Sequence, residues 1–293
     1  MSKSTKQVEQ LSRVIPSRLP PKIEVFAVGD IHGRARALRD TLSAIRAMPK
    51  CEGTRRIVVF LGDLIDRGPE NLLVLKLVSR ASVLMNADEV RLLPGNHELM
   101  LLDYLDRVSN VWLFNGGTVM LDELDCDWRS LRWLDVVDAV RAALPDSFET
   151  AIRNAPSHLQ IGGLLFVHAG LAPHKAPEVH LQKRRVHETD SMHWAWIREP
   201  FLNWMRGWTW SVARGEYSWG DSVVVHGHSA AVEASLAVSP GRLSSCDRID
   251  THRRLCLDAG ASTWDQIAWA HFYQTDGRTM MRLAATVGER RSN

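Results

Sequence analysis

The chain has 293 residues, of which 45% are apolar and 24% charged, and its formal net charge is +2. A chain of this length can bury a large core, either as one α/β domain or as one domain with an insertion. The nearly balanced charge gives no electrostatic argument for a nucleic acid or a membrane as partner. The four cysteines form no Cys-x-x-Cys pair, which argues against a disulfide framework and against a thiolate zinc site.

The start of the chain is polar and rich in proline, and we expect residues 1–22 to form a flexible arm. This stretch lacks the apolar core of a secretory signal. The sequence also contains no apolar run of the roughly 18 residues that a membrane-spanning helix needs. These features predict a cytoplasmic protein.

Apolar runs alternate with helical patterns after the arm. The runs at 23–29, 56–62 and 89–95 predict strands, and the patterns at 34–48 and 70–80 predict the helices between them. This order is typical of βαβ units around a buried, largely parallel sheet. Residues 103–160 then carry apolar side chains at helical spacing, so we expect them to be mainly helical.

Three later apolar runs predict further strands, at 163–170, 222–229 and 253–261. The runs at 266–273 and 278–285 flank an Asp-Gly pair, which predicts a closing β-hairpin. The segment 174–221 carries many of the tryptophans among polar residues. We expect it to form a lid or part of a cleft wall, with its tryptophans packed over the sheet.

Asp, Asn and His residues stand beside glycines at the ends of five predicted strands. Because the carboxyl ends of parallel strands line one crevice, these residues should converge although they lie far apart in the sequence. The flanking glycines let the backbone turn sharply out of each strand. The residues are Asp30, His32, Asp63, Asn96, His97, His168, His226 and His228.

This set of side chains suits a pair of metal ions. Carboxylate, amide and imidazole ligands without a thiolate suit Mn, Fe, Zn or Co rather than a structural zinc. The set is larger than one ion needs, and ion pairs about 3.5–4 Å apart are typical of phosphatases and nucleases. Taken singly, each residue could be a turn former, a helix cap or a buried structural histidine. It is their conjunction that predicts a metal site.

As a set, the motifs resemble those of the PPP phosphatases, close to bacterial Ser/Thr protein phosphatases and related to diadenosine tetraphosphatases. They occur in the family's order, and further similarity covers 196–202 and 257–261. The resemblance implies a calcineurin-like metallophosphoesterase domain over residues 23–293, an α/β sandwich of two mixed β-sheets flanked by helices. The motifs are Gly-Asp-Ile-His-Gly at 29–33, Gly-Asp-Leu-Ile-Asp-Arg-Gly at 62–68, Gly-Asn-His-Glu at 95–98, Val-His-Ala-Gly at 167–170 and His-Gly-His at 226–228.

The resemblance also implies two divalent metal ions, with manganese as the first choice and iron, zinc or cobalt as alternatives. His228 is preferred to His226 as a ligand because the family places the ligand in the Gly-His pair. Asp258, at the end of a later strand, is expected to support the site from outside the ligand set. The implied ligands are Asp30, His32 and Asp63 for the first ion, and Asp63, Asn96, His168 and His228 for the second.

The family's chemistry is direct, in-line attack on phosphorus by a hydroxide bridged between the two metals, without a phospho-enzyme. By the same resemblance, Arg67 and Arg198 would hold the phosphate oxygens, because a guanidinium matches a phosphate face with two hydrogen bonds. Arg214 is a second candidate for this role. His97, held by Asp66, would protonate the leaving alkoxide as general acid.

We therefore predict a Ser/Thr protein phosphatase that acts on a phosphorylated protein or a small phosphoester, with no nucleic acid or membrane as partner. The alternative, a dinucleoside polyphosphate hydrolase, uses the same metal core. Against it, Asp66 stands where the symmetrical tetraphosphatases tend to carry Ala, and Glu98 stands where they tend to carry Asp. A third possibility is a non-catalytic phosphopeptide-binding scaffold, which the intact ligand set and the His97–Asp66 pair disfavour.

Overall fold

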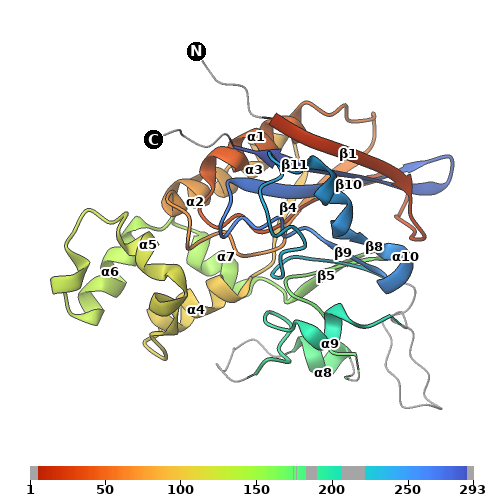
Figure 1. Ribbon diagram of the computed structural model, residues 1–293. Coiled ribbons are helices and arrows are strands. Elements are labelled where there is room, and N and C mark those ends of the chain that lie inside the picture. The colour runs from red at the N-terminus through yellow and green to blue at the C-terminus, as the bar shows by residue number, and fades with distance from the viewer. Residues whose placement is uncertain (1–5, 174, 176, 183–189, 206–221, 289–293) are drawn as a thin grey trace.

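The computed structural model describes residues 6–173, 175, 177–182, 190–205 and 222–288 (Figure 1). They form a six-stranded and a five-stranded sheet, as the predicted α/β sandwich requires. Both sheets are mixed: the first joins three parallel strands to antiparallel strands on one side, and the second has antiparallel strands on both sides of a parallel centre.

The first sheet has the strand order β1-β11-β10-β2-β3-β4. Strands β2, β3 and β4 are parallel, and the C-terminal hairpin continues the sheet in antiparallel fashion. The predicted Asp-Gly turn joins β10 to β11, and both of its residues have positive φ angles. The strands are β1 (Lys6–Val14), β2 (Ile23–Val28), β3 (Arg55–Phe60), β4 (Glu89–Leu92), β10 (Gln266–Thr275) and β11 (Arg278–Val287).

The second sheet has the order β5-β6-β7-β9-β8, with a parallel centre of β6, β7 and β9. Its first strand lies at the end of the region 103–160, which is otherwise mainly helical, as predicted. The strands are β5 (His158–Ile161), β6 (Leu164–Val167), β7 (Val223–His226), β8 (Asp247–Arg248) and β9 (Arg254–Cys256).

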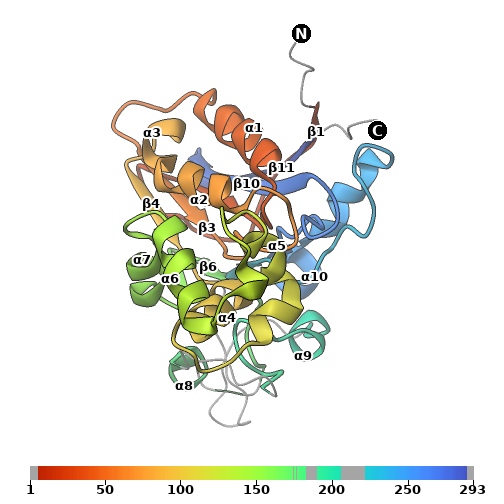
Figure 2. The same ribbon diagram turned by 90° about the vertical axis from the view of Figure 1, so that its left-hand side faces the viewer.

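Helices flank the sandwich, and Figures 1 and 2 show α4 to α7 gathered at one end of it. Short 3₁₀ turns occupy Trp128–Ser130 and Pro240–Cys246, and a π-helical turn occupies Leu113–Gly117. The helices are α1 (Ala35–Arg46), α2 (Asn71–Ser79), α3 (Ala81–Met85), α4 (Asn96–Leu105), α5 (Thr118–Leu121), α6 (Trp133–Ala143), α7 (Phe148–Asn154), α8 (Pro177–Leu181), α9 (Glu199–Leu202) and α10 (Ile249–His252).

The central strands are buried on both faces, which explains why their sequences read as nearly continuous apolar runs. In β2, Val25 and Ala27 belong to the core between the two sheets, whereas Phe26 and Val28 belong to the core beneath α1 and α2. This alternation follows from the two-residue period of a strand. A third core packs the outer face of β6 and β7 against the described residues 190–204.

The structure corrects the expectation of a flexible arm over residues 1–22. Residues Lys6–Val14 form the edge strand β1, antiparallel to β11, and Val8 is buried between the sheets. The Arg13 guanidinium also pairs with Asp247 at 2.6 Å. The apolar side chains here are too sparse to show a strand period, and the strand forms because β11 offers it an open edge. Within the described part of the chain, none of the helices has both the length and the apolarity to cross a membrane.

Candidate metal centre

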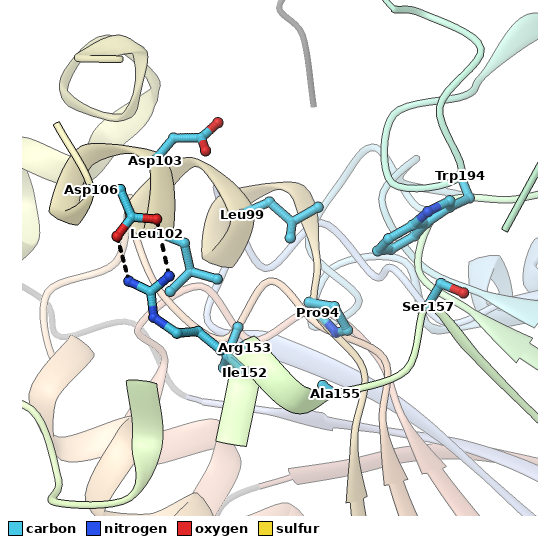
Figure 3. Close-up of a pocket in the computed structure, with 10 residues that line it drawn as sticks. All are labelled: Pro94, Leu99, Leu102, Asp103, Asp106, Ile152, Arg153, Ala155, Ser157 and Trp194. Carbon is cyan, nitrogen blue, oxygen red and sulfur yellow. Dashed lines mark hydrogen bonds and ion pairs between the residues drawn. The ribbon is translucent and has the colours of Figure 1, made fainter. Parts of the chain in front are cut away.

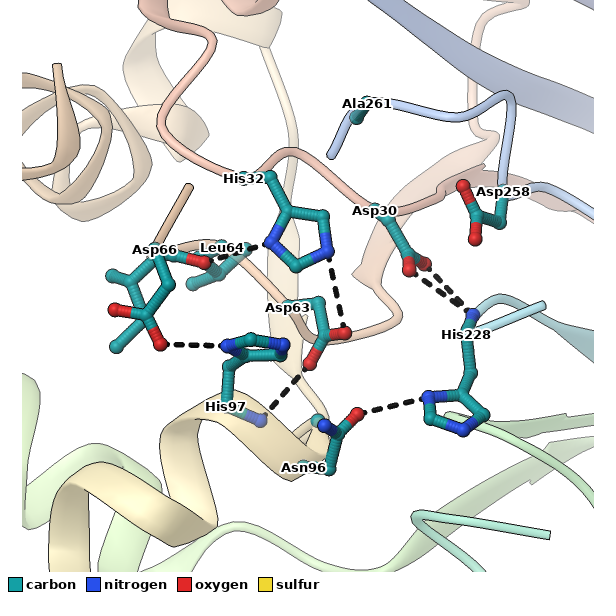
Figure 4. Close-up of polar contacts among 12 residues, drawn as sticks. Asp30, His32, Asp63, Leu64, Asp66, Asn96, His97, His228, Asp258 and Ala261 are labelled. Carbon is teal, nitrogen blue, oxygen red and sulfur yellow. Dashed lines mark hydrogen bonds and ion pairs between the residues drawn. The ribbon is translucent and has the colours of Figure 1, made fainter. Parts of the chain in front are cut away.

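The predicted ligands converge at one edge of the sandwich (Figure 4). Asp30 and Asp63 follow β2 and β3, and Asn96 begins α4 directly after β4. From the second sheet, His168 follows β6 and His228 follows β7. All of these side chains are buried, so the carboxyl ends of strands from both sheets enclose the centre.

Glycines allow the strand ends to approach so closely. A Cβ atom on Gly227 would lie 2.0 Å from Oδ1 of Asp30, and one on Gly95 would lie 2.2 Å from Oδ1 of Asp63. His32, Asp63 and His228 have φ angles of 45°, 51° and 66°, a region that non-glycine residues rarely occupy. Such strain persists only where the surroundings compensate for it.

Local hydrogen bonds supply that compensation. The His32 backbone N–H donates to the carbonyl of Asp63 at 2.9 Å, and the His228 backbone N–H donates to both Asp30 oxygens at 3.1 Å. Glu98, at the start of α4, accepts backbone N–H groups of Asp63, Leu64 and Gly95, each at 2.8 Å. Glu98 therefore joins the turn after β3 to the turn after β4. The sequence analysis used Glu98 only to compare families, although a Glu at this helical position is the signature of a capping box.

The ligand atoms around Asn96 are all hydrogen-bond acceptors. Nδ1 of His168 lies 2.8 Å from the carbonyl of Leu61 and must donate to it, so Nε2 carries a bare lone pair. This Nε2 lies 3.0 Å from Oδ1 of Asn96 and 3.3 Å from Oδ1 of Asp63. Such contacts are favourable only with a proton or a metal cation at Nε2, and the imidazole, amide and carboxylate side chains fit a metal ion.

His228 shows the same pattern. Its Nε2 lies 3.2 Å from the carbonyl of Trp196 and donates to it. Its Nδ1 is then the free acceptor, 2.9 Å from Oδ1 of Asn96. Potential ligand atoms of Asp63, His168 and His228 all lie within 4.8 Å of one another. A hydrogen-bonded partner on the second ring nitrogen is what orients histidine ligands in metal sites.

A second group shares Asp63. Nδ1 of His32 donates to the carbonyl of Ile65 at 2.9 Å, which leaves Nε2 facing Oδ2 of Asp63 at 3.5 Å. The third residue of this group in the structure is His97, and the place of Asp30 in the first ligand set stays a prediction. With one carboxylate in both groups, the geometry suits two ions bridged by Asp63. Asp30 lies beside them and accepts from His228.

The electrostatics of the centre also favour a bound cation. Burial opposes ionisation of Asp63, but the neighbouring histidines outweigh it and hold its pKa well below the usual range. Burial alone would lower the pKa of His168, yet the Asp63 charge raises this pKa to about 9. Burial, together with Asp258 and Asp63, raises the pKa of Asp30 well above its ordinary value. A proton on His168 therefore balances the Asp63 carboxylate when no metal is bound, and a metal ion could take the place of that positive charge.

Asp258 occupies the supporting place that the sequence analysis expected. It is buried near Asp30 (Figure 4), and one of its oxygens accepts the backbone N–H of Gly260 at 2.8 Å. Burial raises the pKa of Asp258, while the backbone donor and nearby histidines lower it. It contributes negative charge to the centre but does not belong to either ligand group.

The acid–base pair lies beside the ligands. Nδ1 of His97 is 2.6 Å from Oδ2 of Asp66, and both side chains are buried. Burial lowers the pKa of His97 to about 4 and raises that of Asp66 well above its ordinary value. The Asp66 carboxyl also accepts a hydrogen bond from Trp112, a contact with no signal in the sequence.

Both candidate phosphate-binding arginines are exposed at the rim of the centre. Arg198 donates to the carbonyl of His228 at 3.2 Å and to Oγ of Ser229 at 3.0 Å. The positive charge of Arg67 contributes to lowering the pKa of His97, although burial is the larger cause. Two exposed guanidinium groups beside a cation site are suited to an anionic substrate. Arg214 lies outside the described residues.

A cavity of about 190 Å³ lies on the opposite face of α4 (Figure 3). Leu99, Leu102 and Asp103 line it at helical spacing, and Asp106 pairs there with Arg153 at 2.7 Å. None of the proposed ligands lines this cavity. Helix α4 therefore presents its N-terminal residues to the metal centre and its outer face to a separate hollow.

Residues 23–271 match the family model described as calcineurin-like phosphoesterase, and the chain belongs to this family. The grouped His and Asp side chains suit the divalent metals that a metallophosphoesterase domain uses.

Relatives with two different names match parts of the chain. A serine/threonine-protein phosphatase 2 of Escherichia coli is 35% identical over 35% of this chain and 43% of its own length. A symmetrical bis(5'-nucleosyl)-tetraphosphatase of Janthinobacterium is 30% identical over 50% of this chain and 44% of its own length. The matched segments thus span less than half of either relative. A protein serine/threonine phosphatase structure from Saccharomyces cerevisiae aligns with a TM-score of 0.47, at 14% identity over 93% of this chain and 82% of that one.

Proposed function

We propose that this metallophosphoesterase is a protein Ser/Thr phosphatase that hydrolyses phosphomonoesters with two divalent ions, manganese before iron, zinc or cobalt. The observation that carries the proposal is the buried His97–Asp66 pair at 2.6 Å beside the candidate ligands. A serine or threonine alkoxide is a poor leaving group and needs a proton as the P–O bond breaks. A nucleotide phosphate leaves more readily, so an oriented general acid favours an alkyl phosphomonoester.

The two ions, when bound, would make hydroxide available near neutral pH and counter the charge of the phosphate. In the proposal, the ligands are Asp30, His32, Asp63, Asn96, His168 and His228. Five of these ligands are supported by side-chain atoms that face one another around Asp63 and Asn96. Asp30 is included through the family resemblance and lies beside them, where it accepts the His228 backbone N–H.

The remaining chemistry belongs to three side chains. Arg67 and Arg198 hold the non-bridging oxygens of the phosphate from the rim. In this role His97 acts as the imidazolium: its Nε2 proton goes to the leaving oxygen, while its Nδ1–H remains donated to the ionised Asp66 carboxylate. The charge of that carboxylate has to offset the burial that lowers the pKa of His97. The proton is replaced from the attacking water, so the products are the free alcohol and phosphate.

The test uses chelator-treated protein with p-nitrophenyl phosphate, a phosphothreonine peptide and diadenosine tetraphosphate, each with and without manganese. We expect manganese-dependent phosphate release from the first two substrates and little from the nucleotide. His97→Asn should lower kcat for the peptide by about 10²–10⁴-fold, the range for general acid catalysis. Metal binding without turnover of any substrate would support the scaffold instead.

The second candidate is a symmetrical dinucleoside tetraphosphatase. Relatives with that name match half of this chain, a longer stretch than the named protein phosphatases match. Preference for diadenosine tetraphosphate in the same assay would establish this activity and leave the metal site unchanged.

The proposed domain covers residues 23–293, with 174–221 as part of the cleft wall. The packing of Trp194, Ile197 and Phe201 against the second sheet supports that role for the described part of the segment. The proposed substrate is a phosphorylated protein or a small phosphoester, and the cytoplasmic location stays a prediction.

A further inference from the structure

A third side chain extends the His97–Asp66 pair. The indole N–H of Trp112 donates to both oxygens of Asp66, at 3.0 Å and 2.9 Å. The Oδ2 atom of Asp66 in turn lies 2.6 Å from Nδ1 of His97. The indole and the carboxylate are fully buried, and the imidazole is nearly so. The three groups therefore form one continuous hydrogen-bonded chain.

The direction of each hydrogen bond in this chain follows from chemistry. An indole nitrogen can only donate, so the Asp66 carboxyl must accept from Trp112. A donor placed between the two oxygens fixes the plane of the carboxyl group and turns Oδ2 toward His97. The Asp66 backbone has a φ angle of 74°, and its N–H donates to Oδ1 of Asn71 at 2.7 Å. Asp66 is thus held at both its backbone and its side chain.

The turn Leu113–Gly117 makes room for the indole. A Cβ atom on Gly117 would come within 2.4 Å of the Trp112 ring, so this position requires glycine. On another side, the Tyr104 ring packs with its centre 5.0 Å from that of Trp112. These contacts leave the indole little freedom to rotate away from Asp66.

The same turn reaches the phosphate-binding rim. Gly116 has a φ angle of 105°, and its carbonyl accepts the backbone N–H of Arg67 at 3.4 Å. Asp66 and Arg67 are adjacent, so one turn contacts both the orienter of the acid and a candidate phosphate ligand. The segment from Trp112 to Gly117 is therefore placed to influence chemistry rather than only packing.

We propose that Trp112 is a positioning residue for phosphoester hydrolysis. Its indole N–H holds the Asp66 carboxyl, and through it the His97 imidazole, in the orientation that delivers a proton to the leaving oxygen. This inference rests on the proposed role of His97 as general acid. As the P–O bond breaks, its electron pair stays on the leaving oxygen, which takes the proton from Nε2 of His97. Loss of the indole N–H should therefore lower kcat most for substrates whose leaving group needs that proton.

The kinetic test compares Trp112→Phe with the parent chain on two substrates of the metal-loaded enzyme. With a phosphothreonine peptide, we expect kcat to fall about 10–100-fold, within the contribution of general acid catalysis, with KM nearly unchanged. With p-nitrophenyl phosphate, whose leaving group is stable without a proton, kcat should fall less than about threefold. Equal losses on both substrates, or no loss on either, would overturn the proposal.

Trp269→Phe is the matched control. Trp269 is also fully buried, but its indole nitrogen has no hydrogen-bond partner among the described residues. The Trp269→Phe substitution should lower stability because the ring is smaller. It should leave unchanged the ratio of kcat for the phosphothreonine peptide to kcat for p-nitrophenyl phosphate. A similar change of that ratio in the control would show that Trp112 acts through packing alone.

A spectroscopic measurement separates this inference from the proposed function. In the zinc-loaded chain with ¹⁵N-labelled histidine, the Nδ1–H of His97 should give a far-downfield proton signal, because its hydrogen bond to Asp66 is short and buried. The signal should shift or exchange away in Trp112→Phe and persist in Trp269→Phe. Persistence in both variants would overturn the positioning role whatever the substrate. If the parent chain hydrolyses neither phosphomonoester but the signal still changes in Trp112→Phe, the proposed function is wrong. The hydrogen-bonded role of Trp112 would then still stand.

Discussion

Two clusters of buried charge lie at opposite ends of the same strands. At the carboxyl ends of β2 and β3, the Asp63 centre brings together acceptors without matching donors. At the amino ends, Arg56 donates to Glu24 at 2.7 Å, and His271 lies 2.9 Å from the other oxygen of Glu24. The remaining Arg56 donors reach backbone carbonyls of Ile45, Met48 and Met85.

Burial alone therefore does not identify a functional site. Arg56 is fully buried, like the metal centre, but its cluster balances cation against anion, and its guanidinium nitrogens all meet acceptors. Among the described residues, Nδ1 of His271 is the atom of this cluster left without a partner. In the Asp63 cluster, several acceptor atoms face one another and only a proton on a histidine can compensate them. Since unpaired buried polar groups are costly, that arrangement suits a bound cation. The contrast between these two clusters leads to four testable expectations.

The largest stability effect should come from Arg56→Met. The substitution leaves Glu24 buried without its partner, and breaking a buried ion pair typically costs about 3–5 kcal/mol. Urea denaturation measures the loss, and folded protein should keep its metal content. Arg55→Met is the control. Arg55 pairs with Glu89, but its side chain is exposed, so this ion pair should contribute at most about 1 kcal/mol to stability. Equal losses in the two variants would contradict the balance inferred for Arg56.

The largest effect on activity should come from Asp63→Asn. This residue is common to both ligand groups, so we expect activity to fall by more than about 100-fold, beyond the usual cost of removing a group that only supports a ligand. Elemental analysis should show metal loss in the same variant. Asp138→Asn removes an equal charge from an exposed site on α6 and should change neither quantity. Full metal occupancy in Asp63→Asn would argue against a bridging role.

Metal removal should lower stability through the Asp63 centre alone. A ligand at about 100 times its dissociation constant stabilises a fold by about 2.7 kcal/mol. We expect a shift of that order between manganese-loaded and chelated protein, measured by urea denaturation. The shift should survive in Arg55→Met and vanish in Asp63→Asn. An unchanged midpoint on chelation of the parent chain would count against the site.

The smallest effect should be a pH dependence at the balanced cluster. Burial opposes ionisation of Glu24, but hydrogen bonds from His271 and Arg56 outweigh it and lower its pKa below 4.5. A carboxyl with a lowered folded-state pKa stabilises the fold above its ordinary pKa and loses that contribution as pH falls through the folded value. The stability difference between the chelated parent chain and Glu24→Gln should therefore shrink as pH falls below 4.5. A constant difference would show that Glu24 acts by packing.

Local sequence patterns predict the central strands, their succession along the chain and the residues that gather at the candidate metal centre. These follow from local patterns and one topological rule, because polar residues after parallel buried strands must emerge at the same edge. Asp30, Asp63, Asn96, His168 and His228 all satisfy that rule. The hairpin turn at the C-terminus is equally local, since Asp-Gly favours the positive φ angles that it requires.

Three features become visible in the folded chain alone: the pairing of β1, the charge balance around Arg56 and the contact from Trp112 to Asp66. Each depends on a partner far away in the chain and on a neighbour that makes room, such as Gly117 beside the indole. Neither an edge strand with few apolar residues nor a donor in an irregular turn leaves a periodic signal in the sequence. Periodicity reports which face of an element is buried, whereas the choice of partner is set by packing in three dimensions.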